Sequence, residues 1–402
     1  MTRVPYLTSR LQGFGSTIFA RMSALAVETG SLNLGQGFPD WEPPPVVTDA
    51  AVAAINGGHN QYPPLLGIPA LREAVARHQE RFWGLRFDPA AEVLVTAGAT
   101  EAIAAALLGL CETGDEVIAF DPSYDSYAAG IAMAGAVLRP VALRPDPESG
   151  RFGFDPDELR AAFGARTRLI LLNTPHNPTG KVFDRDELGL IAELCRAHDV
   201  LAVTDEVYEH MVFGTGAHLP LAGFPGMAER TLTISSGGKT FSCTGWKVGW
   251  VCGPASLILP VLTAKQFLTF VNGGPFQPAI AAGLDQPDRF YTDLTDDLAA
   301  KRDRLTRYLD TAGFRVLPAE GTYFVCVDVR PLGFDDGVEL ALALPERAGV
   351  VAVPVSVFSQ DPAGCAHLLR FCFAKSDEVL DEAGQRLVRA FAGSPGSPGF
   401  PA

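Results

Sequence analysis

The sequence predicts an α/β protein with one large, mostly parallel sheet of seven strands, followed by a smaller α+β domain. Three observations carry this prediction. Seven short apolar segments recur between residues 93 and 252. Segments with helical character lie among them, as expected of a mainly parallel sheet that helices cover on both faces. After residue 286 this alternation stops and a long charged helix begins.

The predicted strands are short runs rich in apolar and β-branched residues, which is typical of strands buried on both faces. They are 93–96, 116–120, 137–141, 168–172, 200–204, 231–235 and 248–252.

Helices are predicted where apolar residues recur at helical spacing or where good helix formers accumulate. Segments 67–83 and 102–110 meet these criteria. Asp184 and Glu187 have the spacing of a capping box, so a further helix should begin there and end near His198.

The chain beyond residue 286 predicts a second, smaller domain. A charged helix at 288–312 precedes strand-like segments, and a helix at 378–391 follows them. The strand-like segments are 322–329, 350–354 and 368–373. The predicted division is 1–45 for an N-terminal arm and part of the small domain, 46–286 for the large domain, 287–392 for the small C-terminal domain and 393–402 for a disordered tail.

Composition excludes several classes of protein. The net charge is −14 and no Lys/Arg run occurs, so nucleic acid is not an expected partner. No apolar stretch reaches the length of a membrane span, and the first residues do not resemble a signal peptide. The seven cysteines include no C-x-x-C pair, which favours reduced thiols in a cytoplasmic protein and predicts no metal site.

Polar residues that could bind a ligand follow four of the predicted strands. In such sheets, ligands bind beyond the carboxyl ends of the strands. Ala99 and Thr100 begin a helix after 93–96, where backbone amides favour an anion. After 200–204, Asp205 ends an apolar strand, so its carboxylate should be partly buried and need a cation or donors. Tyr208 follows three residues later.

Two further strands end in residues of the same kind. Two asparagines, including Asn177, follow 168–172 in a rigid turn, and Ser236 and Lys239 follow 231–235. Lys247 comes eight residues after Lys239. A lysine, a carboxylate, hydroxyl and amide donors and an anion site at one sheet edge are what pyridoxal phosphate requires, so the sequence predicts this cofactor.

Arg370 lies within the apolar run 368–373. A buried guanidinium needs an anion, and its planar fork suits a carboxylate. The alternative is an ion pair with only a structural role.

Five motifs resemble those of the class I and II pyridoxal-phosphate-dependent aminotransferases of fold type I, over about residues 14–391. Within that family the chain is most similar to the branch of kynurenine, glutamine and methionine aminotransferases, and especially to the N-succinyldiaminopimelate aminotransferases. The motifs are Asn33-Leu34-Gly35-Gln36-Gly37-Phe38-Pro39-Asp40, Asn60-Gln61-Tyr62, Asn177-Pro178-Thr179-Gly180, Thr204-Asp205-Glu206-Val207-Tyr208 and the segment from Ser236-Gly237-Gly238-Lys239 to Gly249.

The resemblance implies a role for each matching residue. Lys239 would bind the cofactor covalently, Asp205 would pair with its ring nitrogen, and Asn177 and Tyr208 would donate to its ring oxygen. Tyr124 would stack on the ring. The phosphate would be held by Ala99, Thr100, Ser236 and Lys247.

The resemblance also implies substrate contacts and a homodimer. Tyr62 would reach the phosphate in the neighbouring subunit's site. Gly37, Asn177 and Arg370 would receive the substrate α-carboxylate, and Phe14 and Phe270 would line the side-chain pocket.

Three positions depart from the family pattern. Lys247 stands where the broad family has arginine, although this branch shares the lysine. Thr100 stands where kynurenine-type enzymes have tyrosine, and Val271 where some of them have histidine. The last two departures favour N-succinyldiaminopimelate over kynurenine as a substrate.

The expected function is therefore an amino transfer between an L-amino acid and a 2-oxo acid, with N-succinyldiaminopimelate and glutamate/2-oxoglutarate, in lysine biosynthesis, as the suggested pair. Kynurenine, methionine or glutamine transamination and β-elimination from cysteine conjugates remain alternatives. A non-enzymatic pyridoxal-phosphate regulator is disfavoured because no DNA-binding module precedes residue 14. A Rossmann dehydrogenase is disfavoured because no G-x-G-x-x-G follows a first strand.

Overall fold

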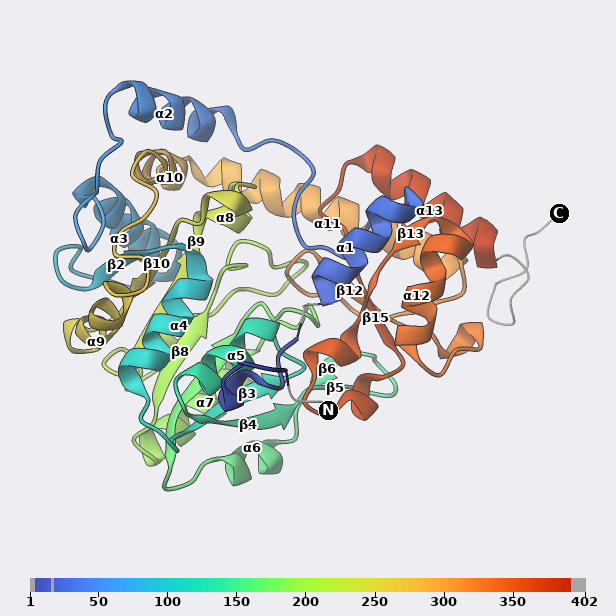
Figure 1. Cartoon of the computed structure of the whole chain (residues 1–402), viewed down its shortest axis with the longest axis horizontal. Helices are drawn as coiled ribbons and strands as arrows, with labels where there is room; N and C mark the ends of the chain where they lie inside the picture. The colour runs from blue at the N-terminus through green and yellow to red at the C-terminus, as the bar shows by residue number, and fades with distance from the viewer. Residues whose placement is uncertain (1–3, 16–17, 392–402) are drawn as a thin grey trace.

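The computed structural model describes residues 4–15 and 18–391, which form two lobes (Figure 1). The larger lobe contains a seven-stranded sheet in the order β2-β10-β9-β8-β7-β3-β4. Only β10 runs antiparallel to its neighbours, so the prediction of a mostly parallel sheet is confirmed. The strands are β2 (Val93–Thr96), β3 (Glu116–Asp121), β4 (Val137–Ala142), β7 (Thr167–Asn173), β8 (Leu201–Asp205), β9 (Thr231–Ser236) and β10 (Gly249–Cys252).

Consecutive residues of the central strands enter different hydrophobic cores, because side chains of a strand alternate between its faces. In β7, Leu169 and Leu171 join a cluster with α4, α5 and α9, whereas Ile170 and Leu172 join a cluster with α6 and α7. Both faces of the sheet are therefore covered. These helices are α4 (Gly98–Leu110), α5 (Asp125–Met133), α6 (Pro156–Ala162), α7 (Arg185–Ala197) and α9 (Ala255–Lys265).

The capping box predicted from Asp184 and Glu187 is confirmed at the start of α7. The Asp184 carboxylate accepts hydrogen bonds from the backbone N–H groups of Asp186 and Glu187, and the Glu187 carboxylate accepts one from Asp184. Backbone N–H groups at the start of the helix, which have no partner within the helix, thereby gain hydrogen-bond acceptors.

Three more helices, α2 (Pro45–Asn56), α3 (Pro69–Trp83) and α10 (Phe276–Leu284), lie at the far edge of the larger lobe, where α10 packs against both α2 and α3. They and the strands β2 and β10 contribute to a separate apolar cluster that contains the buried Trp250. Short β5 (Arg144–Pro145) and β6 (Phe152–Gly153) form a hairpin.

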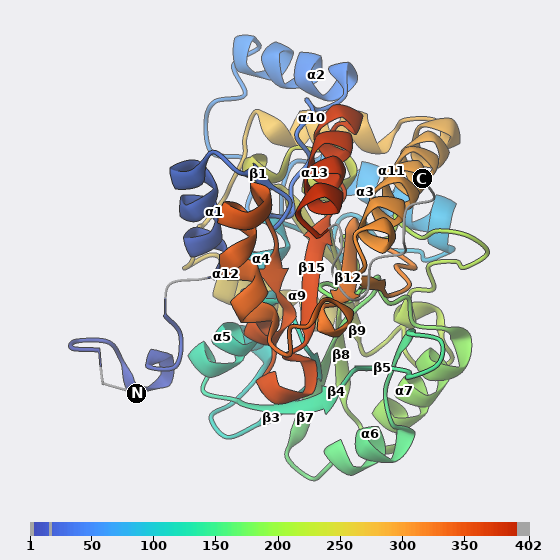
Figure 2. The same cartoon turned by 90° about the vertical axis from the view of Figure 1, so that its right-hand side faces the viewer.

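The smaller lobe is built on a four-stranded antiparallel sheet in the order β11-β12-β15-β14. Figure 2 shows α11, α12 and α13 grouped around β12 and β15. The strands are β11 (Arg315–Val316), β12 (Phe324–Asp328), β14 (Val353–Pro354) and β15 (Leu368–Cys372), and the helices are α11 (Asp288–Thr311), α12 (Gly337–Ala348) and α13 (Asp377–Phe391).

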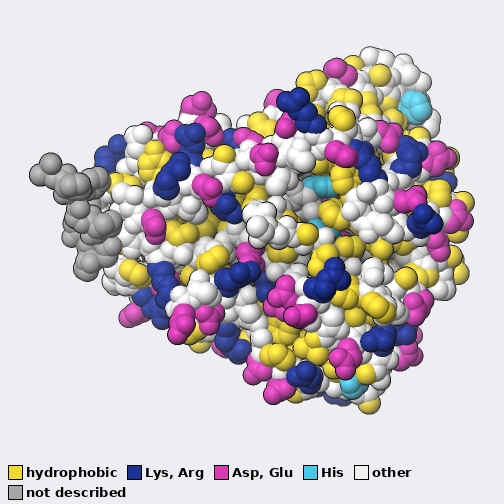
Figure 3. All heavy atoms as spheres, turned by 180° about the vertical axis from the view of Figure 1, so that it is seen from behind, with side chains coloured by type: hydrophobic (Ala, Val, Ile, Leu, Met, Phe, Trp, Pro, Cys, Tyr) yellow, Lys and Arg dark blue, Asp and Glu magenta, His cyan; other side chains and the backbone are white. Residues whose placement is uncertain are grey.

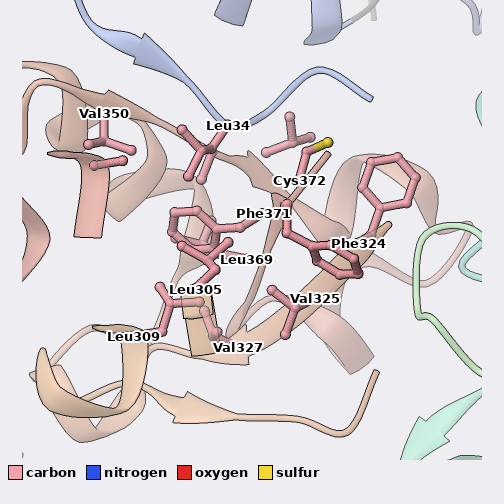
Figure 4. Close-up of a cluster of buried hydrophobic side chains, with 14 of the residues drawn as sticks. Leu34, Leu305, Leu309, Phe324, Val325, Val327, Val350, Leu369, Phe371 and Cys372 are labelled. Atoms are coloured by element: carbon pink, nitrogen blue, oxygen red, sulfur yellow. The ribbon is translucent and has the colours of Figure 1, made fainter. Parts of the chain in front are cut away.

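The N-terminal segment joins this smaller lobe. β1 (Leu32–Asn33) pairs in parallel with β13 (Val350–Val351), and α1 (Ile18–Thr29) contacts α12. Figure 4 shows Leu34 in the same apolar cluster as Leu305 and Leu369. The consequence for the site is that Gly35 and Gly37, which follow β1, lie beside β15 and β12.

The structure corrects two strand predictions in the smaller lobe. Segment 322–329 begins as a turn, because Thr322 has a left-handed φ of 69°, and β12 starts only at Phe324. Segment 350–354 is divided between β13 and β14, which pair with different strands. The predicted disordered tail, 393–402, lies outside the described residues, and the division into domains stays a prediction.

The surface in Figure 3 carries acidic and basic side chains interspersed, with no continuous basic area on that face. All seven cysteines are unpaired thiols. Among the described residues, we find no helix with the length and apolarity needed to span a membrane.

Candidate active site

One pocket collects most of the residues predicted from the sequence. We call it the central pocket. It lies where the carboxyl ends of β7, β8 and β9 meet the start of α4, as expected for an open α/β sheet. The predicted residues that line it are Ala99, Thr100, Tyr124, Asn177, Asp205, Tyr208, Ser236, Lys239 and Lys247.

Asp205 ends β8 and is buried, so its carboxylate depends on nearby donors. The Tyr127 hydroxyl donates to Oδ2 at 2.6 Å and the Val207 N–H donates to Oδ1 at 3.3 Å. Burial is the main influence on the Asp205 pKa and raises it. A cation bound in the pocket would restore the charged form of this carboxylate, because opposite charges favour ionisation.

Sequence reasoning missed Tyr127 and gave no ligand role to Asn173. Tyr127 lies on α5, one helical turn after Tyr124, so both rings reach the pocket from the same side of that helix. That spacing is the signal that could have identified it. Asn173 ends β7, and its side chain accepts from the Asn177 N–H at 2.7 Å and donates to the Asp205 carbonyl at 2.8 Å. It therefore holds two predicted site residues in register.

Replacing Tyr127 by phenylalanine should weaken cofactor binding about tenfold, because a buried carboxylate loses its shortest hydrogen bond. Absorbance titration of the cofactor-free protein with pyridoxal phosphate measures this. Tyr308→Phe is the matched control, since it removes another tyrosine–aspartate hydrogen bond, to Asp381, outside the pocket. Equal affinities for the Tyr127 variant and the wild type would show that the bond does not support Asp205.

Lys239 lies in the short helix α8 (Gly237–Thr240), directly after β9, and its side chain reaches into the central pocket. Nζ donates to the Tyr323 hydroxyl at 3.0 Å. Burial, the largest influence, lowers the Lys239 pKa to about 8, although Asp205 opposes this shift. A lysine with this pKa has an appreciable neutral fraction near neutral pH and can act as a nucleophile or base.

The start of α4 forms an anion cup. Gly98 has a φ of +74°, and a Cβ there would lie 3.2 Å from the Lys247 Nζ, so the ammonium group lies against the first turn of α4. A Cβ on Gly249 would lie 2.7 Å from the Gly98 carbonyl carbon. Glycine at both positions lets β10 and α4 approach closely, so the Lys247 ammonium lies near the helix start where the amides of Ala99 and Thr100 favour an anion.

Arg370 lies in β15 and is buried, 1% exposed. Nη1 donates to Asn177 Oδ1 at 2.7 Å and Nη2 donates to the Gly35 carbonyl at 2.9 Å. The guanidinium stacks 3.8 Å from the Phe324 ring centroid. These named contacts are to neutral groups and to an aromatic ring, and the alternative of a structural ion pair stays a prediction.

Gly37 is close to the same group of side chains. A Cβ at Gly37 would lie 2.3 Å from Phe324 Cζ, so only glycine fits. The Gly37 carbonyl accepts from the Tyr323 hydroxyl at 2.8 Å. The structure thus brings the three residues predicted to receive the substrate carboxylate, Gly37, Asn177 and Arg370, to one side of the pocket.

Three predicted residues lie away from the central pocket of their own chain. Tyr62 and Phe270 are exposed, by 81% and 49%, and pack edge to face at 5.6 Å between ring centroids. Phe14 lines a neighbouring cavity that shares Tyr124 with the central pocket. Their predicted roles are not tested by a single chain.

The residues fit the cofactor that the sequence implies. The pocket offers a lysine amine, a buried carboxylate that accepts hydrogen bonds from neutral donors, and a cup with glycine backbone and a lysine charge. Pyridoxal phosphate has the complementary groups, namely an aldehyde, a ring nitrogen and a phosphate.

Another polar cluster, His78, Glu209 and His210, has ligand atoms within 4.8 Å of one another. The two histidine Nε2 atoms are hydrogen-bonded at 2.7 Å, and Glu209 accepts from Ser235 and Trp83. The two Nε2 atoms and the Glu209 carboxylate are thus already hydrogen-bonded, so we assign no metal to them. The prediction that the protein holds no metal stays a prediction.

Comparison with known proteins gives consistent matches. The family model described as aminotransferase class I and II matches residues 29–387. A probable N-succinyldiaminopimelate aminotransferase of Mycobacterium tuberculosis is 54% identical over 387 residues, covering 94% of this chain and 97% of that protein. The Escherichia coli methionine aminotransferase is 41% identical, covering 96% and 99%. The solved N-succinyldiaminopimelate aminotransferase structure from M. tuberculosis superposes with a TM-score of 0.93 at 53% identity, covering 96% and 100%.

Proposed function

The chain belongs to the class I and II aminotransferase family, and from that premise we propose that it moves an amino group between N-succinyldiaminopimelate and 2-oxoglutarate, using pyridoxal phosphate bound to Lys239. The observation that carries the substrate proposal is the 54% identity, over nearly the whole of both chains, to a probable N-succinyldiaminopimelate aminotransferase. Lysine biosynthesis is the corresponding pathway, and the unpaired thiols favour a cytoplasmic location.

The proposed cofactor contacts are those that the family resemblance implies, and the shared lining of the central pocket supports them. Asp205 would pair with the ring nitrogen, Asn177 and Tyr208 would donate to the ring oxygen, and Tyr124 would stack on the ring. Ala99, Thr100, Ser236 and Lys247 would hold the phosphate in the anion cup. When bound, the cofactor supplies an electron sink that stabilises negative charge at the substrate α-carbon.

The chain's own residues then perform three tasks. Arg370 and the Gly37 segment bind the substrate α-carboxylate and so orient the α-carbon. The Lys239 amine, once free, would remove the proton from the substrate α-carbon as a base and, as an acid, deliver it to C4′ of the cofactor. The fixed charge of Asp205 stabilises positive charge opposite it throughout. The pKa of about 8 lets Lys239 serve as both base and acid.

Replacing Arg370 by lysine should raise KM for the amino acid about 10- to 100-fold, with a smaller effect on kcat, because lysine cannot make the paired hydrogen bonds of a guanidinium. Steady-state kinetics measure this. Arg304→Lys, an exchange in a partly exposed ion-pair network on α11, is the control and should leave KM unchanged. An unaltered KM in the Arg370 variant would show that the carboxylate binds elsewhere.

The substrate proposal is tested by comparing kcat/KM for N-succinyldiaminopimelate, methionine, glutamine and kynurenine with 2-oxoglutarate as acceptor. We expect the first to be preferred by at least about tenfold, a difference that one substrate-specific contact supplies. Preference for methionine would favour the activity that the E. coli relative's name gives. Acceptor-independent release of ammonia from a cysteine conjugate would favour β-elimination.

We further propose a homodimer in which Tyr62 completes the anion cup of the partner subunit. Tyr62 is exposed and packs on Phe270. Phe267, three residues before Phe270, is exposed by 82%, so the two segments offer apolar rings to a second copy. Light scattering at micromolar concentration tests this, and a fully active monomer would contradict it.

A further inference from the structure

Tyr323 lies at the junction of the two lobes and has no role in the assignments above. It comes directly before β12 and is completely buried. Its ring packs edge to face on the Tyr208 ring, with 5.2 Å between centroids, and the Lys239 Nζ lies 5.5 Å from the Tyr323 centroid. The phenol of the smaller lobe therefore enters the environment of a lysine from the larger lobe.

The hydrogen bonds of the Tyr323 hydroxyl to the Gly37 carbonyl and to Lys239 define its chemistry. It donates its single hydrogen to the Gly37 carbonyl at 2.8 Å. It is therefore an acceptor towards Lys239, whose Nζ donates to it at 3.0 Å. Burial raises the Tyr323 pKa far above its usual value, so the phenol remains neutral and keeps this arrangement.

The backbone around Tyr323 is fixed from both lobes. The Thr322 N–H donates to the Met211 carbonyl in the larger lobe at 2.9 Å, and Thr322 holds a left-handed φ of 69°. The Phe373 N–H donates to the Tyr323 carbonyl at 2.9 Å, which ties it to the end of β15. A Cβ on Gly37 would lie 3.2 Å from Tyr323 Cε2, so the Gly37 segment packs directly on the ring.

We propose that Tyr323 is a positioning residue for Lys239, which holds the amine by accepting its hydrogen bond and links it to the Gly37 segment that receives the substrate carboxylate. This inference rests on the proposed function, because it assigns to Tyr323 the support of the lysine that binds the cofactor. Tyr323 acts through Lys239 and takes no proton itself, since its own hydrogen is bonded to Gly37.

The groups that face Lys239 determine how its pKa responds when the Tyr323 oxygen is removed. They are Asp205 on β8, Lys247 before β10, Arg370 and Cys372 on β15, and the phenols of Tyr208 and Tyr323. Asp205 and Cys372 favour the ammonium form, whereas Lys247 and Arg370 oppose it. The Tyr323 oxygen stabilises an ammonium more than a neutral amine, because hydrogen bonds from charged donors are stronger. Its loss should lower the Lys239 pKa below about 8.

The test is Tyr323→Phe in the full-length chain, which keeps the ring and removes only the oxygen. The rate of pyridoxal phosphate binding to cofactor-free protein is followed against pH by the visible absorbance. Only the neutral amine reacts, so the midpoint reports Lys239, and ionisations of the free cofactor cancel between variants. We expect the midpoint to fall by about one pH unit, the size of one charge-assisted hydrogen bond. In the reconstituted enzyme, kcat should fall more than KM rises.

Tyr291→Phe is the matched control. Tyr291 is also buried and donates to the Gly283 and Leu284 carbonyls, outside the central pocket. The Tyr291→Phe variant should be less stable than the wild type, but its rate of cofactor binding should have the same pH midpoint. A Tyr323 variant with the wild-type midpoint and kcat, or an equal shift in the Tyr291 variant, would overturn the proposal. A wild type that never binds the cofactor would refute the proposed function instead, so the two failures are distinguishable.

Replacement of Tyr323 by 3,5-difluorotyrosine keeps the proposal testable should Tyr323→Phe fail to fold. The ring, the hydroxyl and its bond to Gly37 are retained, but the oxygen becomes a weaker acceptor. We expect a smaller shift of the midpoint in the same direction, with kcat reduced. No shift would mean that the oxygen does not hold the amine.

Discussion

Lys239→Ala should bind no cofactor covalently, show no visible absorbance from that bond, and lose at least about 10⁴-fold in kcat. The effect is the largest that we expect for any single residue, because the variant lacks both the group that binds the cofactor and the base that moves the α-proton. No other lysine lines the central pocket except Lys247, which lies against the anion cup. The spectrum and single-turnover kinetics measure the two losses separately.

Lys301→Ala is the matched control for this variant. Lys301 is also largely buried, but it pairs with Asp377 in the smaller lobe. Its removal should lower Tm and leave the absorbance and kcat intact. Normal turnover by the Lys239 variant would refute the assignment of the catalytic lysine.

Asp205→Ala should bind the cofactor poorly and lose most activity, and Asp205→Asn should lose on the order of 10³-fold in kcat, as expected when a preorganised charge is removed. The asparagine variant keeps the shape of the side chain and its contact with Tyr127, so its loss reports the charge itself. Cofactor affinity and kcat are measured together. A near-normal rate would remove the proposed role of Asp205.

Asp328→Asn is the control for the aspartate variants. Asp328 is equally buried, but it pairs with Arg330 at the end of β12. This substitution should reduce stability while the central pocket retains cofactor affinity. Equal losses in both variants would indicate that burial of a charge, and not its position, determines the effect.

The sequence predicted the part of the site that depends on strand ends. Asp205, Ser236 and Asn177 follow buried strands, and the ends of parallel strands meet at one edge whatever the details of packing. For the same reason the order of apolar segments was enough to predict a mostly parallel sheet. The antiparallel direction of β10 depends on the long connection through residues 237–248, whose path local patterns do not determine.

Contacts between the two lobes could not be predicted from local patterns. Tyr323 contacts Lys239 only because Thr322 takes a left-handed φ and the segment docks against the Met211 loop. The Gly37 segment reaches Arg370 because β1 pairs with β13, more than 300 residues away in sequence. These arrangements arise from tertiary packing, which overrides local propensity.

Tyr127 illustrates a different limit. Its place on α5, one turn after Tyr124, could have been predicted, but its bond to Asp205 required the position of α5 on the sheet. A carboxylate expected to be buried indicates that hydrogen-bond donors lie near it, but the sequence does not show which residues supply them.

The most direct test of the central claim is the visible spectrum of the purified protein before and after one amino donor is added without acceptor. The claim predicts a yellow protein whose absorbance bleaches on addition of N-succinyldiaminopimelate or glutamate, with one equivalent of 2-oxo acid released per site. A colourless protein that cannot be reconstituted with pyridoxal phosphate would contradict it.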